Sequence, residues 1–260
     1  MHAEAGGAKG DEVADISLLS DKLIPLRERL IVPLDVPSED DAKRLVNQLG
    51  SSAEFYKLGL QLFMTGNYFS LVAWLREKGK QVFVDLKFFD VPQTVAFAVR
   101  QLQGKGATFA TVHGNDDILE AACREKDGTK ILAVTVLTSL DDKDLKDLGF
   151  QVDTLALVLS RARRALAIGC DGVISSGQES RELRSDLGAR FLVVVPGIRP
   201  VANTDDQKRT VDVEEAFLNG ADYIVVGRPI LRAPDPGAAA EAIQSRIATL
   251  FGSRTEGSHR

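Results

Sequence analysis

The chain has 260 residues, of which 44% are hydrophobic, enough to build one large domain around a substantial core. Its formal net charge of -5, without a dense run of Lys and Arg, argues against nucleic acid as the main partner. No apolar run approaches the roughly 20 residues of a membrane span, and the N-terminus lacks the basic and apolar regions of a signal peptide. We therefore expect a cytoplasmic protein that binds neither nucleic acid nor a membrane.

Cysteine and histidine are scarce and scattered. Cys123 and Cys170 sit in unrelated sequence contexts and belong to no CxxC or Cys/His metal pattern. His2 and His259 lie near the ends of the chain, which leaves His113 alone in its interior. The sequence therefore predicts no zinc site, and it favours a reduced setting for the two thiols.

Both ends of the chain look like tails. Residues 1–15 are rich in Ala, Gly and charge, which is typical of a disordered segment. Residues 16–29 are predicted as a short helix that covers one end of the fold. Residues 252–260 are predicted as a second tail, so that 16–251 form a single domain.

Within that domain, short apolar runs alternate with helical segments. The predicted strands comprise residues 30–35, 55–58, a run that opens at Val82, 107–113, 131–137, 172–175, 191–195 and 223–226. The predicted helices comprise residues 38–49, 68–78, 94–103, 116–125, 141–148, 154–167, 179–187, 213–218 and 236–250.

This alternation predicts the fold class. Strands that are apolar throughout are typical of parallel strands buried on both faces. About eight such strands, with a helix after each, match a (β/α)8 TIM barrel, which needs roughly 250 residues. Gly106, Gly169 and Gly220 each follow a helix and precede a strand, where glycine can end the helix in the left-handed conformation. A doubly wound open sheet remains the alternative.

The segment from Val82 to Thr94 carries the most unusual charge pattern. In a strand, residues two apart share a face, so Asp85 and Lys87 are expected to point the same way. Asp90 follows just beyond the strand, which Pro92 prevents from continuing. The pattern is compatible with a paired ion cluster at a strand end, or with an active site of alternating charges.

Further polar residues fall at the predicted strand ends, where the active site of a barrel lies. They are Asp35, Lys57, His113, Thr138, Ser139, Arg199 and Arg228. Gly197 and Gly227 would allow a ligand close to the backbone, and Arg228 offers forked donors to phosphate oxygens. We therefore expect an anion site after the last two strands. The long polar loop 200–210 resembles a lid over it more than a turn.

At this point the chain resembles a known family. Residues 85–94, DLKFFDVPQT, resemble the DxKxxD[IV]PxT signature of the orotidine 5′-phosphate decarboxylase family. The resemblance continues in the segments 32–35 (VPLD), 57–59 (KLG), 135–139 (TVLTS), 195–200 (VPGIRP) and 226–230 (VGRPI). These motifs occur in the expected order over about residues 28 to 250.

The resemblance implies decarboxylation of orotidine 5′-phosphate to uridine 5′-phosphate, the last step in the synthesis of that nucleotide, without a metal ion or a cofactor. It implies Lys87 as proton donor to the C6 carbanion, in a catalytic set with Lys57, Asp85 and Asp90. It further implies that Asp35 and Lys57 bind on the ribose side, that Thr138 contacts the base region, and that Arg199, Gln207, Gly227 and Arg228 bind near the phosphate.

The family resemblance also implies a homodimer with shared active sites. Asp90 would reach into the site of the neighbouring subunit, and Thr94 would cross the interface with it. One departure is visible, since many relatives have histidine where this chain has Phe89. Phe89 does not belong to the charged set.

Two alternatives stay open. Magnesium-dependent 3-keto-gulonate-phosphate decarboxylases share a DxKxxD pattern, but they have an acidic metal ligand on strand two where this chain has Lys57. A lysine at that position would repel a cation. A non-catalytic sensor of a phosphate ligand is the other alternative, which the intact set of Lys57, Asp85, Lys87 and Asp90 disfavours.

Overall fold

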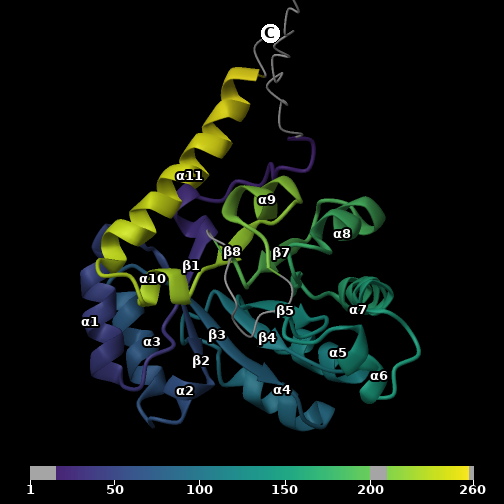
Figure 1. Ribbon diagram of the computed structural model, residues 1–260. Coiled ribbons are helices and arrows are strands. Elements are labelled where there is room, and N and C mark those ends of the chain that lie inside the picture. Colours follow the sequence, from purple (N-terminus) through teal and green to yellow (C-terminus); the bar gives the residue numbers. More distant parts are fainter. Residues whose placement is uncertain (1–15, 200–209, 258–260) are drawn as a thin grey trace, which may run out of the picture.

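The computed structural model describes residues 16–199 and 210–257, and within them parallel strands close into a barrel (Figure 1). The strands are β1 (Leu30–Pro33), β2 (Phe55–Gly59), β3 (Gln81–Phe88), β4 (Phe109–Val112), β5 (Lys130–Val134), β6 (Gly172–Ile174), β7 (Leu192–Val195) and β8 (Tyr223–Val225). Each strand pairs in parallel with the next, and β1 also pairs with β8. The predicted (β/α)8 barrel is therefore confirmed, and the open sheet is excluded.

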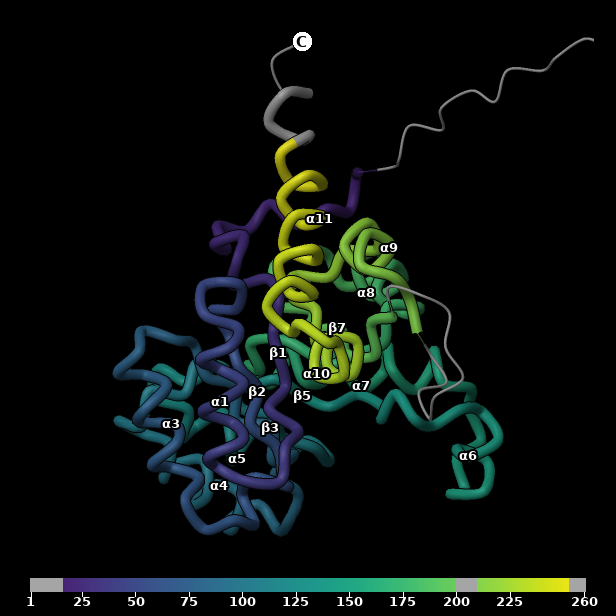
Figure 2. Tube along the Cα trace, turned by 60° about the vertical axis from the view of Figure 1, so that its left-hand side comes forward, coloured from purple at the N-terminus to yellow at the C-terminus, as the bar shows by residue number. Residues whose placement is uncertain are grey.

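Helices surround the barrel on its outside (Figures 1 and 2). They are α1 (Glu39–Leu49), α2 (Leu60–Phe63), α3 (Tyr68–Glu77), α4 (Pro92–Arg100), α5 (Asp116–Arg124), α6 (Asp142–Asp147), α7 (Thr154–Ile168), α8 (Ser180–Leu187), α9 (Val213–Leu218), α10 (Arg228–Leu231) and α11 (Pro236–Gly257), with 3-10 turns η1 (Leu26–Arg29) and η2 (Gly50–Ser52). The short α2 and α10, which directly follow β2 and β8, were not predicted. Their few residues lie too close to a strand end to show a helical period.

Local chemistry explains how these helices begin and end. Ser38 caps α1, and its side chain accepts a hydrogen bond from the backbone N–H of Asp41. Gly169 ends α7 with a φ of 109°, as expected for a left-handed helix terminus. Gly220 directly follows the C-cap of α9 and also has positive φ, as predicted. Gly106 has positive φ too, but it lies in a turn five residues beyond Gln101, the C-cap of α4, so it does not end that helix.

The predicted helix over residues 16–29 is wrong except for the 3-10 turn η1 at its end. Pro25 disfavours helical backbone in the residue before it, and the segment instead runs irregularly across the N-terminal ends of the strands. Ile24 packs against the apolar cluster inside the barrel. The segment thus covers one end of the fold, as expected, but without the predicted helix.

The last helix, α11, is longer than predicted. It continues through Gly252 to Gly257, where the sequence analysis placed a tail from residue 252. One glycine costs a helix only about 1 kcal/mol relative to Ala. Before that point Phe251 packs against the ring of Phe217 and the guanidinium of Arg29. The helix contacts α1, α10, η1 and α9 as it runs along the barrel (Figure 2).

Two apolar layers hold the barrel together. Inside it, the rings of Phe55, Phe83, Phe109 and Tyr223 form a connected cluster, with centroids of neighbouring rings 5.0 to 5.8 Å apart. Outside it, side chains on the opposite strand faces pack against the helices. This cluster fills the barrel interior with apolar side chains.

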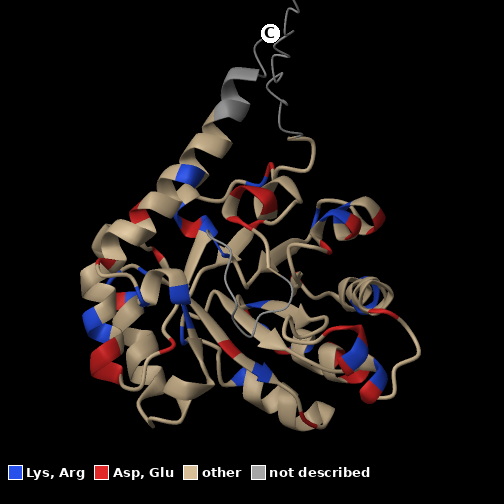
Figure 3. Cartoon of the chain, viewed as in Figure 1, with Lys and Arg blue, Asp and Glu red and all other residues tan. Residues whose placement is uncertain are grey.

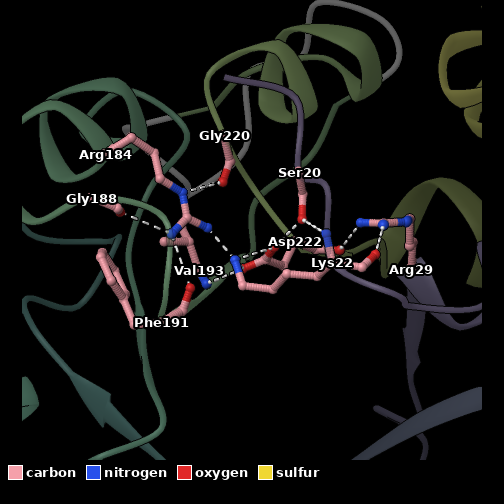
Figure 4. Close-up of polar contacts among 9 residues, drawn as sticks. All are labelled: Ser20, Lys22, Arg29, Arg184, Gly188, Phe191, Val193, Gly220 and Asp222. Carbon is pink, nitrogen blue, oxygen red and sulfur yellow. Dashed lines mark hydrogen bonds and ion pairs between the residues drawn. The ribbon is translucent and has the colours of Figure 1, made fainter. Parts of the chain in front are cut away.

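A buried ionic network closes the opposite, N-terminal end (Figure 4). Asp222 lies just before β8 and is fully buried. Its carboxylate accepts hydrogen bonds from Lys22 at 3.0 Å, Arg184 at 2.7 Å, Ser20 at 2.5 Å and the backbone N–H of Val193 at 2.9 Å. The network ties the segment before β1 to α8 and to the start of β7. We call these side chains and the Val193 N–H the Asp222 network.

The molecular surface carries charges of both signs. Figure 3 shows Lys and Arg interspersed with Asp and Glu over the outer helices. In the part of the chain that the structure describes, no helix has the length and apolar character needed to cross a membrane.

Candidate active site

A cavity of about 290 Å³ opens at the C-terminal rim of the barrel. Its size suits a small ligand. The predicted site residues that line it are Asp35, Lys57, Asp85, Lys87, Thr138, Arg199, Gly227 and Arg228. Side chains from β1, β2, β3 and the segments after β5, β7 and β8 therefore meet in one place, as the predicted barrel requires.

Asp85 lies at the centre of the charged part of this cavity. One carboxylate oxygen accepts a hydrogen bond from Lys87 Nζ at 2.9 Å, and the other lies 3.1 Å from Lys57 Nζ. Lys57 Nζ also lies 3.6 Å from the carboxylate of Asp35. Phe83, one pleat below on β3, faces the barrel interior, so Asp85 and Lys87 share its face as predicted. We call Asp35, Lys57, Asp85 and Lys87 the Asp85 cluster.

The backbone at Lys87 is bent to make this contact. Its φ of 47° is the only positive value among the non-glycine residues that the structure describes. The pairing of β3 with β4 shifts register between Val84 and Phe88, so β3 bulges at this point. A residue held in this sparsely populated region costs on the order of 1 kcal/mol and is common at functional sites.

Thr111 is a supporting residue that the sequence analysis missed. It is 1% exposed, on β4, and its hydroxyl donates to the Asp85 carboxylate at 2.9 Å while accepting from the Lys87 backbone N–H at 3.0 Å. It thereby holds both the carboxylate and the bent backbone. A threonine inside an otherwise apolar strand was the available signal, but threonine is also an ordinary strand residue.

The Asp85 cluster keeps its charges despite burial. Burial alone would raise the pKa of Asp85, but the ammoniums of Lys57 and Lys87 outweigh it and hold the pKa below its ordinary value. Burial alone would lower the pKa of Lys57, but Asp85 and then Asp35 outweigh it and raise the pKa. Both groups are therefore ionised at neutral pH.

The predicted anion-binding residues line the cavity after β7 and β8. Arg228 begins α10 directly after Gly227, and Arg199 follows Gly197 after β7. A Cβ atom on residue 227 would approach the Pro33 ring to 3.0 Å, so glycine allows this close packing of β8 against β1. Two arginines thus line the same cavity as the Asp85 cluster.

The predicted lid falls largely outside the described residues, and Gln207 lies there too. The two flanks of that segment are held together. Ile198 pairs with Val211 in a parallel bridge, and the backbone N–H of Arg199 donates to the Val211 carbonyl at 3.0 Å. The segment therefore leaves and re-enters the fold at the rim, next to Arg199.

Two of the predicted site residues do not line the cavity. Asp90 and Thr94 line a separate depression with Lys87, Leu60 and Phe89. Asp90 is exposed, and its carboxylate accepts from the Val91 backbone N–H at 2.6 Å. Exposed large apolar side chains lie beside it, namely Leu60, Phe63 and Phe89 in the same depression and the adjacent Val91.

His113 lies next to the depression that Asp90 and Phe89 line. Its ring contacts Phe89 edge to face at a centroid distance of 5.1 Å, and it does not line the cavity. Burial, assisted by Arg161 and Lys87, lowers its pKa below the ordinary value. Among the described residues, no group of three or more His, Cys, Asp or Glu side chains is arranged to hold a metal ion.

Comparison with known proteins agrees with this geometry. Residues 28–243 match the family model described as "Orotidine 5'-phosphate decarboxylase / HUMPS family". The chain is 60% identical over 237 residues to the orotidine 5'-phosphate decarboxylase of Methylococcus capsulatus, covering 90% of this chain and 98% of that one. It is 48% identical to the corresponding enzyme of Stenotrophomonas maltophilia, covering 89% of this chain and 98% of that one.

A solved structure shows the same likeness. The crystal structure of orotidine 5'-phosphate decarboxylase from Lactobacillus acidophilus superimposes with a TM-score of 0.74 at 34% sequence identity. The match covers 85% of this chain and 99% of that one.

Proposed function

This chain belongs to the orotidine 5′-phosphate decarboxylase / HUMPS family, and we propose that it converts orotidine 5′-phosphate to uridine 5′-phosphate in pyrimidine nucleotide synthesis. Lys87 donates the proton that replaces the departing carboxylate at C6. The observation that carries the proposal is Asp85 held between Lys57 and Lys87 in a cavity that Arg199 and Arg228 also line.

The chemistry explains why this arrangement is suitable. Loss of CO2 leaves a carbanion at a ring carbon without an adjacent electron sink, so the site must stabilise negative charge where it forms. An ammonium about 4 Å from that charge, at an effective dielectric constant of about 20, contributes roughly 4 kcal/mol. That corresponds to about a thousandfold in rate. Lys87 can supply this charge first and its proton afterwards.

Asp85 has two roles in this proposal. Its carboxylate fixes Lys87 at 2.9 Å and keeps Lys57 protonated. It would also lie near the carboxylate of the bound substrate, and repulsion between the two anions is relieved when CO2 departs.

The remaining stabilisation comes from binding the rest of the nucleotide. Arg199, Arg228 and the backbone beside Gly227 bind the phosphate, together with Gln207 from the lid. Asp35 and Lys57 bind the ribose, and Thr138 contacts the base. Closure of the lid over the phosphate would exclude water and tighten the contacts around the reacting carbon.

We further propose a homodimer with shared active sites. Asp90 and Thr94 lie outside the cavity of their own chain, on a surface with several exposed aromatic and aliphatic side chains. Contiguous apolar surface of this kind is typical of an interface. A second copy packed there would cover these side chains and bring Asp90 to the partner's Lys87.

The metal-dependent alternative within the same family is disfavoured by Lys57. Its ammonium occupies the strand-two position inside the cavity and is held there by Asp85 and Asp35. Its raised pKa keeps it positive at neutral pH, where it would repel a divalent cation. The cavity therefore suits an anionic substrate better than a magnesium complex.

A turnover assay tests the proposal. The purified chain is incubated with orotidine 5′-phosphate or with 3-keto-gulonate phosphate, in chelator and again with added magnesium. We expect uridine 5′-phosphate and CO2 from the first substrate at equal rates in both conditions. Turnover of the second substrate alone, dependent on magnesium, would identify the metal-dependent activity instead. Binding of uridine 5′-phosphate without any turnover would identify a sensor.

A further inference from the structure

The two cysteines, which the sequence places in unrelated contexts, meet in the structure. Cys123 lies in the last turn of α5 and Cys170 in the segment between α7 and β6, 47 positions later. Their sulfur atoms lie 3.5 Å apart, and both are free thiols. A disulfide requires about 2.05 Å between sulfurs, so closure needs an approach of about 1.5 Å. α5 and α7 are neighbours on the outside of the barrel (Figure 1).

Contacts that do not involve the thiols hold this pair together. The backbone N–H of Cys170 donates to the Ala165 carbonyl at 3.0 Å, which fixes the turn after α7. Lys126, just beyond α5, donates to the Gly169 carbonyl at 2.9 Å and to the Asp171 carboxylate at 3.0 Å. Lys126 thus ties the end of α5 to the residues on both sides of Cys170. Hydrogen bonds of neighbouring groups therefore fix the two segments that carry the thiols.

The two thiols are chemically unequal. Cys170 is 6% exposed, whereas Cys123 is only partly buried. The hydrogen bond with Cys170 lowers the pKa of Cys123 against the opposing effect of burial, and the Lys126 ammonium adds to the lowering. The same hydrogen bond, together with burial, raises the pKa of Cys170. A more accessible, more acidic thiol next to a buried partner is the arrangement of a reactive and a resolving cysteine.

We propose that Cys123 and Cys170 form a reversible oxidation site that hydrogen peroxide converts to an intramolecular disulfide. The Cys123 thiolate attacks one peroxide oxygen, the O–O bond breaks, and Cys123 becomes a sulfenic acid while hydroxide leaves and takes a proton as water. The Cys170 sulfur then attacks the Cys123 sulfur, and the S–O bond breaks. The leaving hydroxide takes the Cys170 proton as a second water. Two thiols are oxidised by two electrons, and one peroxide is reduced to two waters.

The position of the pair decides what its oxidation changes. Cys170 precedes β6, and α5 ends shortly before β5 begins, so the pair lies at the N-terminal end of the strands. The cavity lies at the opposite end. A disulfide here would close a loop that contains β5, α6 and α7, which restricts the unfolded chain without touching the cavity. Oxidation should therefore raise thermal stability and leave turnover unchanged.

Intact-mass measurement of the full chain tests the proposal directly. Reduced protein is exposed to a small molar excess of hydrogen peroxide, digested without reduction, and mapped by mass spectrometry. We expect a mass decrease of two hydrogen atoms, a peptide joining Cys123 to Cys170, and reversal by dithiothreitol. The melting temperature should rise on the order of 5 °C on oxidation and return on reduction.

Matched variants assign the roles of the two sulfurs. Cys170→Ser should give no cross-link and should retain added oxygen atoms on Cys123, and Cys170→Ala serves if the serine variant does not fold. Cys123→Ser should show neither product. Oxygen addition to Cys123 without a cross-link in the wild-type chain, a cross-link only between chains, or no reaction at all would each overturn the proposal.

Discussion

Two carboxylates at opposite ends of the barrel each bind two cationic side chains, but they do so in different surroundings. At the N-terminal end, Asp222 is fully buried and is bound by Lys22, Arg184, Ser20 and a backbone N–H (Figure 4). At the C-terminal rim, Asp85 is bound by Lys57, Lys87 and Thr111. The two carboxylates have similar partners, but they differ in how far those partners are exposed to solvent.

The Asp222 network is completed within the chain. The Arg184 side chain is 4% exposed, and its Nε and Nη1 groups donate to the carbonyls of Gly220 and Phe191. The Lys87 side chain, in contrast, is 38% exposed and faces the cavity. The two similar ion clusters therefore differ in role. The Asp222 network stabilises the fold, whereas the Asp85 cluster has charges that are accessible from the cavity. On our proposal, the Asp85 cluster is completed from outside the chain, by the substrate and by a second subunit.

The largest expected effect follows from Lys87→Ala. Turnover of orotidine 5′-phosphate should fall at least about a thousandfold, because both the stabilising charge and the proton are lost. The melting temperature should change little, since Lys57 and Thr111 still bind Asp85 and the Lys87 side chain is 38% exposed. Lys87→Arg is the matched variant that keeps the charge but is a poor proton donor. Recovery of near wild-type turnover by the arginine variant would contradict proton donation by Lys87.

Asp222→Asn should show the opposite behaviour. It leaves the buried Arg184 guanidinium without its counter-charge, which typically costs about 3–5 kcal/mol. We expect a fall in melting temperature of roughly 10 °C, with unchanged turnover per folded molecule at low temperature. Asp116→Asn, which breaks the exposed pair with Arg164, is the control and should have little effect. Stability close to wild type for Asp222→Asn would show that the Asp222 network does not hold the N-terminal end.

Arg228→Ala tests the ligand side of the cavity. Charge-assisted hydrogen bonds to phosphate are worth about 1.5–3 kcal/mol, so the affinity for uridine 5′-phosphate should fall roughly tenfold to a hundredfold. Titration calorimetry measures this directly. Arg232→Ala, at the end of the same short helix but exposed and away from the cavity, should bind normally. Equal affinities in the two variants would argue against a phosphate site after β8.

A smaller effect concerns acid stability. The pKa of Asp85 in the folded chain lies below its ordinary value of about 3.9. Its stabilising contribution is therefore complete above about pH 4 and is lost as the pH falls through the lower, folded value. Urea unfolding should show a constant advantage of wild type over Asp85→Asn from neutral pH down to about pH 4, and a shrinking one below. An advantage that already shrinks near neutral pH would contradict the lowered pKa.

The sequence predicted the barrel and most of the cavity because both depend on short-range patterns. Apolar runs mark buried parallel strands, and two-residue alternation along β3 places Phe83, Asp85 and Lys87 on one face. Once the barrel is assumed, the strand ends must meet at one rim. The predicted cavity residues Asp35, Thr138 and Arg228 follow from that rule.

What the sequence missed depends on contacts between distant segments. Thr111 reaches Asp85 only because β4 lies beside a bulged β3. Cys123 and Cys170 meet only because α5 packs next to α7. Asp222 has the pattern of an ordinary loop residue, and its partner Lys22 comes from a segment wrongly predicted as helix. The local sequence pattern of a helix or strand does not predict such contacts between distant segments.

The central claim is that the Asp85 cluster is completed by Asp90 of a second subunit, and mixing two inactive variants tests it most directly. Lys87→Ala and Asp90→Ala homodimers should each be nearly inactive. In a mixed dimer, one site carries both substitutions and the other carries neither. Random exchange of equal amounts puts about half the dimers in the mixed state, so about a quarter of wild-type turnover should return. No recovery after subunit exchange has been verified would contradict the shared site.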